Sequence, residues 1–244
     1  MELKNNTILI TGGTSGIGLG FAEALSKLGN KVIICGRRED RLKQISKNNP
    51  SIITRKCDVC NEKERIELIS WVTKEHPELN IFINNAGIQT GQKIDAGLNL
   101  QKVRQEVETN FTAPIHLCSL IINHLKTKDH AAIINVSSGL AFVPLAFMSI
   151  YCATKAGIHS FTLSLRYLLK DTKIKVFEIA PPAVDTELGY DHRTNATQSH
   201  GGISVEEFLA ETLQALKNDE YEAAIGTAKN LREKKELLFN MLNK

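Results

Sequence analysis

The apolar residues of this chain form two alternating patterns, short β-branched runs and longer stretches with helical spacing. The runs predict buried strands at residues 7–10, 31–35, 52–57, 81–83, 132–136 and 175–179, and a short last strand at 223–225. Apolar positions three or four residues apart predict helices at residues 19–28, 39–47, 62–75, 100–126, 150–169, 205–217 and 229–242. Regular alternation of this kind requires a mostly parallel sheet with helices on both faces. We therefore predict one α/β domain over residues 1–244, with a doubly wound parallel sheet of six to seven strands.

A glycine-rich turn joins the first strand to the first helix. The sequence GGTSGIG occupies residues 12–18, and helical spacing follows it. In such a turn Gly12 lets the chain reverse, Gly16 lets the backbone approach a pyrophosphate, and Gly18 lets the helix pack closely on the strand. The free N–H groups at the start of the helix attract an anion. The turn therefore predicts a dinucleotide-binding Rossmann fold.

Turn-forming or polar residues stand at the carboxyl ends of the predicted strands. They are Gly12, Gly36, Asp58, Asn85, Ser138 and Pro181. Ligands of doubly wound sheets bind beyond these strand ends. We expect the six segments to line one crevice.

Composition narrows the class of protein. Of the 244 residues, 42% are hydrophobic and 23% are charged, and the net charge of +3 comes with scattered basic residues. This balance predicts no nucleic-acid partner. No signal peptide or membrane-length apolar run is seen, so we expect a cytoplasmic protein with reduced cysteines and no membrane partner. Cys57 and Cys60 form a C-x-x-C pair without further ligands, and we interpret them as two half-buried thiols.

Several motifs follow one another at characteristic distances. They are T-G-x-x-x-G-I-G at residues 11–18, N-N-A-G at residues 84–87, Asn110, Ser138, and Y-x-x-x-K at Tyr151 and Lys155. Each motif is weak alone, but Ser138 precedes Tyr151 by 13 residues and the motifs fall on the expected strands and helices. Over about residues 5–188 the chain resembles the short-chain dehydrogenase/reductase family. The resemblance implies a Rossmann-fold oxidoreductase that binds a nicotinamide dinucleotide and forms a homodimer or homotetramer.

Tyr151 and Lys155 are four residues apart, so a helix places them on one face about one turn apart. A nearby lysine cation favours the phenolate, and we expect it to lower the pKa of Tyr151. Tyr151 would then donate a proton to a carbonyl or accept one from an alcohol, while Ser138 holds the substrate oxygen. The alternative is a tyrosine and a lysine on a surface helix. The resemblance implies that Lys155 also binds the nicotinamide ribose.

Asn110 and Pro114 belong to the long helix predicted at residues 100–126. Pro114 has no N–H to donate to the carbonyl of Asn110, four residues before it. The resemblance implies that this carbonyl holds a water molecule in a proton relay through the lysine. The alternative is a simple kink in a buried helix.

The end of the second strand indicates which dinucleotide is bound. NAD-binding folds usually carry an acid about 20 residues after the glycine turn, but this chain has Gly36 there, followed by Arg37 and Arg38. Guanidinium groups suit a 2′-phosphate, so we predict NADP(H) rather than NAD(H). Glu39 and Asp40 are interpreted as acids in the first turn of the next helix. The expected cofactor-binding residues, several of them implied by the resemblance, are Gly12, Thr14, Ser15, Gly16, Ile17, Gly18, Arg37, Arg38, Asp58, Val59, Asn85, Ala86, Gly87, Tyr151, Lys155, Pro181, Val184 and Thr186.

The turn after the sixth predicted strand has the sequence Pro-Pro, where many members of the family have Pro-Gly. Pro181 is followed by Pro182, which removes a donor and stiffens the turn. Val184 and Thr186 still match positions expected at the carboxamide and the pyrophosphate, and this Pro-Pro-x-Val-x-Thr turn is similar to the DltE-like branch of oxidoreductases. The following residues 187–203 are polar and aperiodic. We expect them to form a mobile lid within a substrate region at residues 186–217.

Two segments bear on the substrate. The residues between Ser138 and Tyr151 are mostly apolar and include Leu140, Ala141, Phe142, Val143, Pro144, Leu145, Phe147 and Met148. They indicate either an apolar substrate or packing beneath the helix, and the sequence leaves both open. In the polar segment, Tyr190, His192, Arg193 and His200 would contact a substrate or stay solvated. We expect no metal site among them.

The favoured function is an NADP(H)-dependent oxidoreductase that moves hydride between the nicotinamide and a carbonyl or alcohol of a small, largely apolar substrate. The alternative is a non-catalytic dinucleotide sensor or scaffold on the same fold. We expect the helices at residues 100–126 and 150–169 to form the subunit interface through surplus apolar residues. These are Ile115, Leu117, Ile121, Phe161, Leu165 and Leu168.

Overall fold

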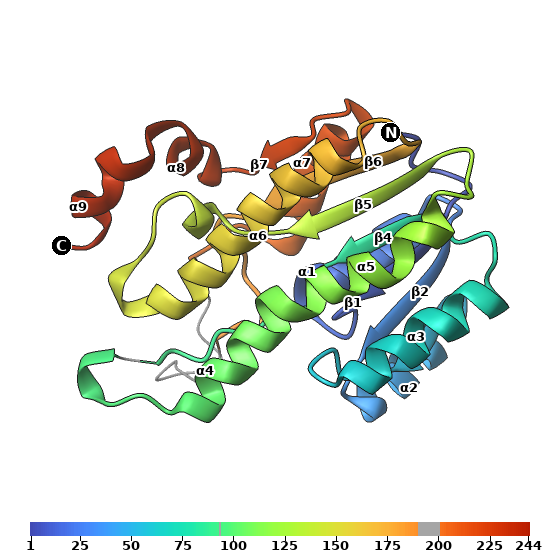
Figure 1. Ribbon diagram of the computed structural model, residues 1–244, viewed down its shortest axis with the longest axis horizontal. Coiled ribbons are helices and arrows are strands. Elements are labelled where there is room, and N and C mark those ends of the chain that lie inside the picture. The colour runs from blue at the N-terminus through green and yellow to red at the C-terminus, as the bar shows by residue number, and fades with distance from the viewer. Residues whose placement is uncertain (93, 190–200) are drawn as a thin grey trace.

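The β-branched runs form the seven strands of one parallel sheet, in the order β3-β2-β1-β4-β5-β6-β7 (Figure 1). The computed structural model describes residues 1–92, 94–189 and 201–244. Its strands are β1 (Thr7–Thr11), β2 (Lys31–Gly36), β3 (Ile52–Lys56), β4 (Ile81–Asn84), β5 (Ala131–Val136), β6 (Ile174–Ala180) and β7 (Glu222–Ala224). The order reverses between β1 and β4, where a doubly wound sheet opens a crevice for a ligand. The predicted fold class is confirmed.

Helices cover both faces of the sheet. One face carries α1 (Gly16–Lys27), α2 (Glu39–Asn48) and α7 (Val205–Lys217). The other carries α3 (Glu62–Glu75), α4 (Leu100–Val107), α5 (Ala113–Leu125) and α6 (Ser149–Leu168), which lie in front of the sheet in Figure 1. Within the described ranges no helix is both long and apolar enough to cross a bilayer.

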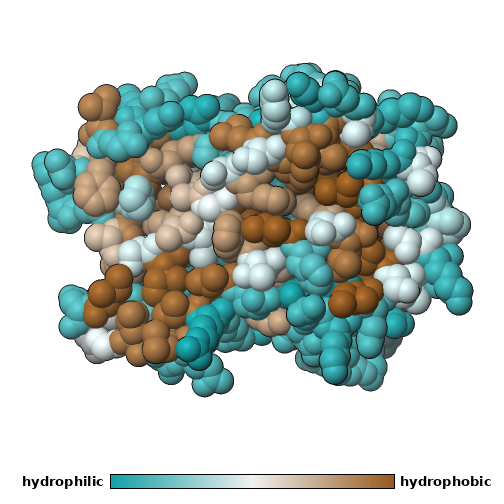
Figure 2. All heavy atoms as spheres, in the orientation of Figure 1, coloured by the Kyte–Doolittle hydropathy of each residue, from teal (hydrophilic) through white to brown (hydrophobic). Residues whose placement is uncertain are grey.

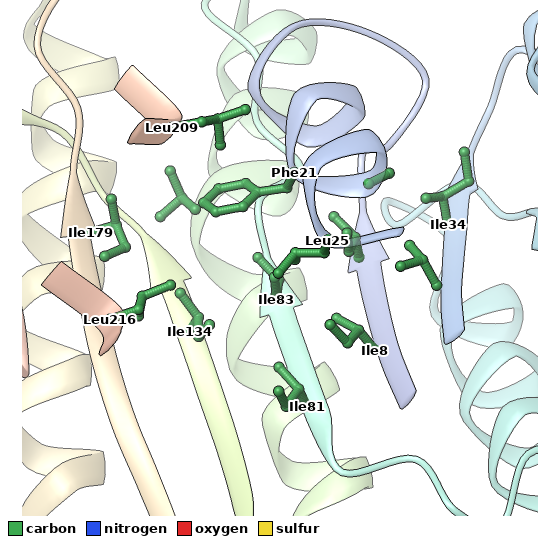
Figure 3. Packing of buried hydrophobic residues seen from close by; sticks show 14 of the residues in the cluster. Ile8, Phe21, Leu25, Ile34, Ile81, Ile83, Ile134, Ile179, Leu209 and Leu216 are labelled. Carbon is green, nitrogen blue, oxygen red and sulfur yellow. The ribbon is translucent and has the colours of Figure 1, made fainter. Parts of the chain in front are cut away.

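Alternate residues of each central strand supply the two layers of the core. Ile8 and Ile10 of β1 face α1, while Leu9 between them faces the opposite helical layer. Phe21 and Leu25 of α1 point at the strand residues of their layer (Figure 3). Burial on both faces explains why these strands are almost continuously apolar.

Pro114 divides the long helix that the sequence predicts at residues 100–126. Between α4 and α5 the chain makes a π-helical turn, Glu108–Thr112, in which the N–H of Ala113 bonds to the carbonyl of Glu108. Pro114 cannot donate the next helical hydrogen bond, so the ladder shifts where the proline enters. The expected interruption is present, and it takes the form of a π-helical turn.

The prediction of one terminal helix at residues 229–242 is wrong. α8 (Ala228–Lys234) ends at Lys235, whose φ of 46° is left-handed, and a 3-10 turn leads to α9 (Phe239–Leu242). Because the helix breaks here, the side chain of Leu238 packs in a small apolar cluster with Phe142 and Val143. Asn243 beyond it accepts a hydrogen bond from the N–H of Ala146 at 2.6 Å. Tertiary packing therefore overrides the helical pattern.

Candidate active site

The glycine turn meets the end of β4 so closely that side chains are excluded. Gly12 and Gly16 have φ values of 68° and 52°. A β-carbon on Gly12 would lie 2.8 Å from the Cα of Ala86. A β-carbon on Gly18 would lie 2.4 Å from both the Nδ2 of Asn85 and the carbonyl oxygen of Gly12. The predicted roles of these glycines in the turn and in helix packing follow from these distances.

The segment Asn84 to Gly87 fixes that contact by hydrogen bonds. Asn85 donates from Nδ2 to the carbonyl oxygen of Thr11 at 2.9 Å. The backbone N–H groups of Asn85 and Ala86 both donate to the hydroxyl of Thr11 at 3.1 Å. β1 and β4 therefore present their carboxyl ends as one unit.

The predicted catalytic residues converge beyond the carboxyl ends of β4 and β5. Tyr151 and Lys155 lie on α6 and are 8% and 5% exposed. The Nζ of Lys155 donates to the carbonyl oxygen of Val136 at 2.9 Å and lies 5.8 Å from the ring centroid of Tyr151. Ser138 follows β5, and its hydroxyl accepts from the N–H of Leu140 at 3.1 Å. The structure brings the serine, tyrosine and lysine together in one buried group.

Asn110 joins this group from the π-helical turn. A β-carbon on Gly87 would lie 3.5 Å from the Oδ1 of Asn110 and 3.6 Å from the Nζ of Lys155, so the three residues meet. Asn110 accepts from the N–H of Ile88 and donates to its carbonyl oxygen, both at 2.8 Å. It also donates to the hydroxyl of Thr154 at 3.3 Å. The side chain of Asn110 thus ties the turn to the strand end after β4.

Burial sets the proton affinities of the tyrosine and the lysine. Desolvation raises the pKa of Tyr151, and the hydroxyl of Ser138 opposes part of that rise. The sequence predicted a pKa lowered by Lys155, but burial dominates in this structure. Desolvation lowers the pKa of Lys155 to about 8, and the charge of Glu178 acts against the fall. Tyr151 is therefore a protonated phenol at neutral pH.

Arg38 lies at the glycine turn, as expected, but a carboxylate faces it. Its guanidinium donates to the hydroxyls of Thr14 at 3.0 Å and Ser15 at 2.6 Å. It also pairs with Glu187 at 3.0 Å, and Arg41 pairs with the same carboxylate at 2.7 Å. A cavity of about 440 Å³ opens here, and its lining includes Thr14, Ser15, Gly16, Arg41 and Glu187.

Arg37 and the acids Glu39 and Asp40 are the other charged residues that directly follow β2. Arg37 is exposed. Glu39 and Asp40 occupy the first turn of α2, as interpreted, and Glu39 pairs with Lys43 at 3.3 Å and Lys56 at 3.2 Å. Glu39 therefore faces other surface groups, and the charged side chains at the glycine turn are Arg38 and the Glu187 that pairs with it.

The comparisons with known proteins agree with this geometry. A family model described as short chain dehydrogenase matches residues 6–197. This chain belongs to the short-chain dehydrogenase family. The chain is 46% identical over 236 residues to the "uncharacterized oxidoreductase DltE" of Bacillus subtilis (strain 168), covering 96% of this chain and 93% of that protein. It therefore lies in the DltE-like branch.

Two further similarities concern other organisms. The chain is 31% identical over 192 residues to an NADP-dependent 3-hydroxy acid dehydrogenase of Schizosaccharomyces pombe, covering 76% of this chain and 74% of that one. The crystal structure of a short-chain dehydrogenase from Burkholderia cenocepacia in complex with NADP has a TM-score of 0.83 and 25% identity, covering 96% and 94% of the two chains. The chain is thus similar in fold and sequence to these proteins over most of its length.

The segment after β6 lies against the glycine turn. The side chain of Thr186 would be 3.1 Å from a β-carbon on Gly16. Val184 pairs with Ile203 in an isolated parallel bridge, with the N–H of Asp185 bonded to Ile203 at 2.9 Å. Pro181 accepts from the N–H of Gly139 at 2.8 Å. These contacts bring the predicted residues of this turn to the crevice and join the two ends of the expected lid.

Asp58 and Val59 follow β3 at the edge of the crevice. The N–H of Asp58 donates to the Oε2 of Glu64 at 2.7 Å, and its Oδ1 accepts from the N–H of Cys60 at 3.0 Å. Val59 is buried. Cys57 and Cys60 are both free thiols. Cys57 is buried, whereas Cys60 is partly exposed, with its Sγ 2.8 Å from the hydroxyl oxygen of Thr109.

Two buried acids near the catalytic group, Glu106 and Glu178, were not predicted from the sequence. Glu106 is almost fully buried, bonds to Thr90, and adds a negative charge that raises the pKa of Tyr151. It precedes Asn110 by four residues, so helical spacing was the available signal. Glu178 lies fully buried in β6. A charged residue between Phe177 and Ile179 of a predicted core strand was its signal.

The apolar segment after Ser138 is only partly packed into the core. Phe142 and Val143 are buried in the cluster with Leu238. Residues Leu140, Ala141, Leu145 and Met148 are only partly buried, and Phe147 is exposed. Tyr190, His192, Arg193 and His200 of the polar segment lie outside the described residues.

Proposed function

We propose that this short-chain dehydrogenase is an NADP(H)-dependent oxidoreductase that transfers hydride between the nicotinamide and a carbonyl or alcohol of a small, largely apolar substrate. The observation that carries the proposal is the convergence of Ser138, Tyr151, Lys155 and Asn110 around Gly87. A protein that only bound the dinucleotide would have no use for a buried proton donor beside a lysine. The alternative of a sensor or scaffold is therefore disfavoured.

The donor set at the glycine turn fits a phosphorylated dinucleotide. Two glycines in the left-handed conformation leave the backbone open at the start of α1, where N–H groups attract a phosphate. Arg38 supplies a guanidinium directly beside this turn. The residues that would hold the adenosine and pyrophosphate parts are Gly12, Thr14, Ser15, Gly16, Ile17, Gly18, Arg37, Arg38, Asp58, Val59, Asn85, Ala86 and Gly87. Lys155, Tyr151, Pro181, Val184 and Thr186 would hold the nicotinamide part.

NADP(H) is the cofactor that the charges favour. The acid typical of NAD-binding folds is replaced by Gly36, and two arginines follow it. Relatives described as NADP-dependent and the neighbour in complex with NADP support the same choice. The bound nicotinamide supplies the hydride, and the protein supplies position and protons.

Tyr151 is the general acid of the reduction. Because burial raises its pKa, the phenol keeps its proton at neutral pH until a carbonyl oxygen beside it gains charge. Ser138 would hold that oxygen. Lys155, buried beneath the ring, orients the site and stabilises the phenolate that forms after the proton has left. Asn110 holds the strand end after β4 in place and, through its carbonyl, would continue a proton relay to solvent.

The substrate body is assigned to the apolar segment after Ser138. Phe147 is exposed and its neighbours are only partly buried in the core, so these side chains can contact a ligand. The expected lid, residues 187–203 within the region 186–217, would cover the other side. Its two ends are held together by the bridge between Val184 and Ile203.

A homodimer or homotetramer is proposed through the face that carries α5 and α6, where Figure 2 shows apolar side chains exposed. Of the six residues expected there, Leu117, Ile121 and Leu165 are buried within the chain itself. Leu168 is 74% exposed, and Leu163 and Tyr167 of the same helix are exposed as well. These residues of α6 now carry the proposal.

The test is a panel of carbonyl compounds assayed with NADPH by nicotinamide absorbance, followed by Tyr151→Phe. This variant removes only the transferable proton, so turnover should fall by roughly a hundred- to ten-thousandfold. NADPH affinity should stay nearly unchanged in calorimetry. Tyr221→Phe, at an exposed tyrosine directly before β7 and outside the proposed site and interface, is the matched control and should keep full activity. Full activity in Tyr151→Phe, or no turnover with any carbonyl, would refute the proposed function.

A further inference from the structure

A fully buried carboxylate lies behind the lysine of the proposed active site. Glu178 is in the middle of β6 and is 0% exposed. An acid in the centre of a parallel sheet is unfavourable unless polar partners surround it. Its partners therefore indicate what the residue does.

Both carboxylate oxygens of Glu178 bond to residues next to the catalytic group. Ser137 donates from its hydroxyl to Oε1 at 2.5 Å, and the Nδ1 of His159 lies 2.8 Å from Oε2. Ser137 directly follows Val136, whose carbonyl oxygen accepts from Lys155. His159 comes one helical turn after Lys155 on α6. The acid is thus connected to the lysine through β5 and through α6.

A second pair of charges completes the surroundings. Glu222 of β7 is bonded to the guanidinium of Arg232 from α8, and Phe142 meets the ring of His159 edge to face. Ligand atoms of His159, Glu178 and Glu222 lie within 4.8 Å of one another. However, Arg232 and Ser137 already donate to these two carboxylates. We interpret the cluster as a hydrogen-bonded charge network.

We propose that Glu178 is a positioning residue that keeps Lys155 protonated beneath Tyr151. The role of Lys155 rests on the proposed function, whereas its charge state does not. An ammonium group buried without a counter-charge loses its proton readily. Burial lowers the pKa of Lys155 to about 8, and Glu178 is the charged group that opposes this fall. His159 lies between the carboxylate of Glu178 and the surface, and its hydrogen bond to Glu178 raises the pKa of the imidazole.

The direct experiment follows the titration of Lys155 in the cofactor-free protein. The ¹³Cε resonance of Lys155 is assigned by its loss in Lys155→Met, and its midpoint is measured in the wild type and in Glu178→Gln. The glutamine keeps the size and one acceptor oxygen, replaces the other by an NH2 donor, and removes the charge. We expect the midpoint to fall by about one pH unit. Glu222→Gln, which removes a carboxylate from the same cluster, should leave the midpoint in place.

Kinetics supply the second measurement. The basic limb of the kcat/KM profile for carbonyl reduction should move to lower pH in Glu178→Gln by the same amount. A midpoint that is unchanged in Glu178→Gln, or one that moves equally in Glu222→Gln, would overturn the proposal. If Glu178→Gln does not fold, Glu178→Met removes the charge in a similar volume and is held to the same outcomes. Absence of reductase activity would refute the proposed function alone, because the resonance is read without substrate or cofactor.

Discussion

Replacing Arg38 by alanine should remove most of the preference for NADPH over NADH. In the structure the guanidinium of Arg38 is shared between the glycine turn and Glu187, so a 2′-phosphate must take it from that carboxylate. A charge-assisted hydrogen bond contributes about 1.5–3 kcal/mol. A half-exposed ion pair contributes about 0.2–1 kcal/mol. The difference, roughly 1–2 kcal/mol, corresponds to about a 5- to 30-fold preference for NADPH.

Calorimetric titration with both cofactors measures this preference. In Arg38→Ala the affinity for NADPH should fall to near that for NADH, and the affinity for NADH should change little. Because Arg38 also bonds to Thr14 and Ser15, the NADH titration reports any damage to the glycine turn itself. Lys43→Ala is the matched control, since it removes a positive charge from the exposed side of α2, where Lys43 pairs with Glu39.

Glu187→Gln should have the opposite effect. Without the competing charge, Arg38 and Arg41 are free for the phosphate, so NADPH should bind about 1.4 to 5 times more tightly and NADH about as before. Equal affinities for the two cofactors in the wild type would refute the reasoning. So would an affinity for NADPH that does not change in Arg38→Ala.

Three further outcomes are expected. Gly18→Ala should lower the free energy of unfolding by about 1–3 kcal/mol in urea titrations, because its β-carbon would lie 2.4 Å from Asn85 and Gly12; an unchanged midpoint would contradict this. Hydrogen exchange of residues 187–203 should slow when NADPH and substrate are both bound, whereas equal exchange in every state would rule out a lid. Light scattering should give the mass of a dimer or tetramer, and Leu168→Arg should reduce that mass; a monomeric wild type at micromolar concentration would exclude the interface.

The sequence predicted what depends on local pattern. Apolar runs with β-branched residues gave the strands, and the helix predicted at residues 62–75 has the bounds of α3, whose first residue is set by the side-chain cap of Asn61. The motifs also indicated which residues meet, since strand ends of a parallel sheet share one edge. Tyr151, Lys155, Ser138 and Asn110 do converge there.

What the sequence could not predict depends on tertiary contacts. The pattern of residues 229–242 is helical, and only the cluster around Phe142 shows why the chain breaks at Lys235. Whether the pKa of Tyr151 is raised or lowered depends on how deeply the ring is buried, and the spacing of residues along a helix does not indicate this depth. The carboxylate opposite Arg38 comes from residue 187, far away in the chain, so no local motif could indicate it.

The parallel bridge between Val184 and Ile203 has a consequence for how this enzyme can diverge. Two backbone hydrogen bonds, from Asp185 to Ile203 and from Ile203 to Ala183, fix where the intervening residues leave and rejoin the domain. Lengthening a closed loop costs little, about 0.6 kcal/mol for each doubling of its length. Insertions and deletions between the two bridge residues should therefore be tolerated while the acid–base group stays unaltered. If this stretch contacts the substrate as proposed, changes in its length are a target for directed evolution at a small cost in stability.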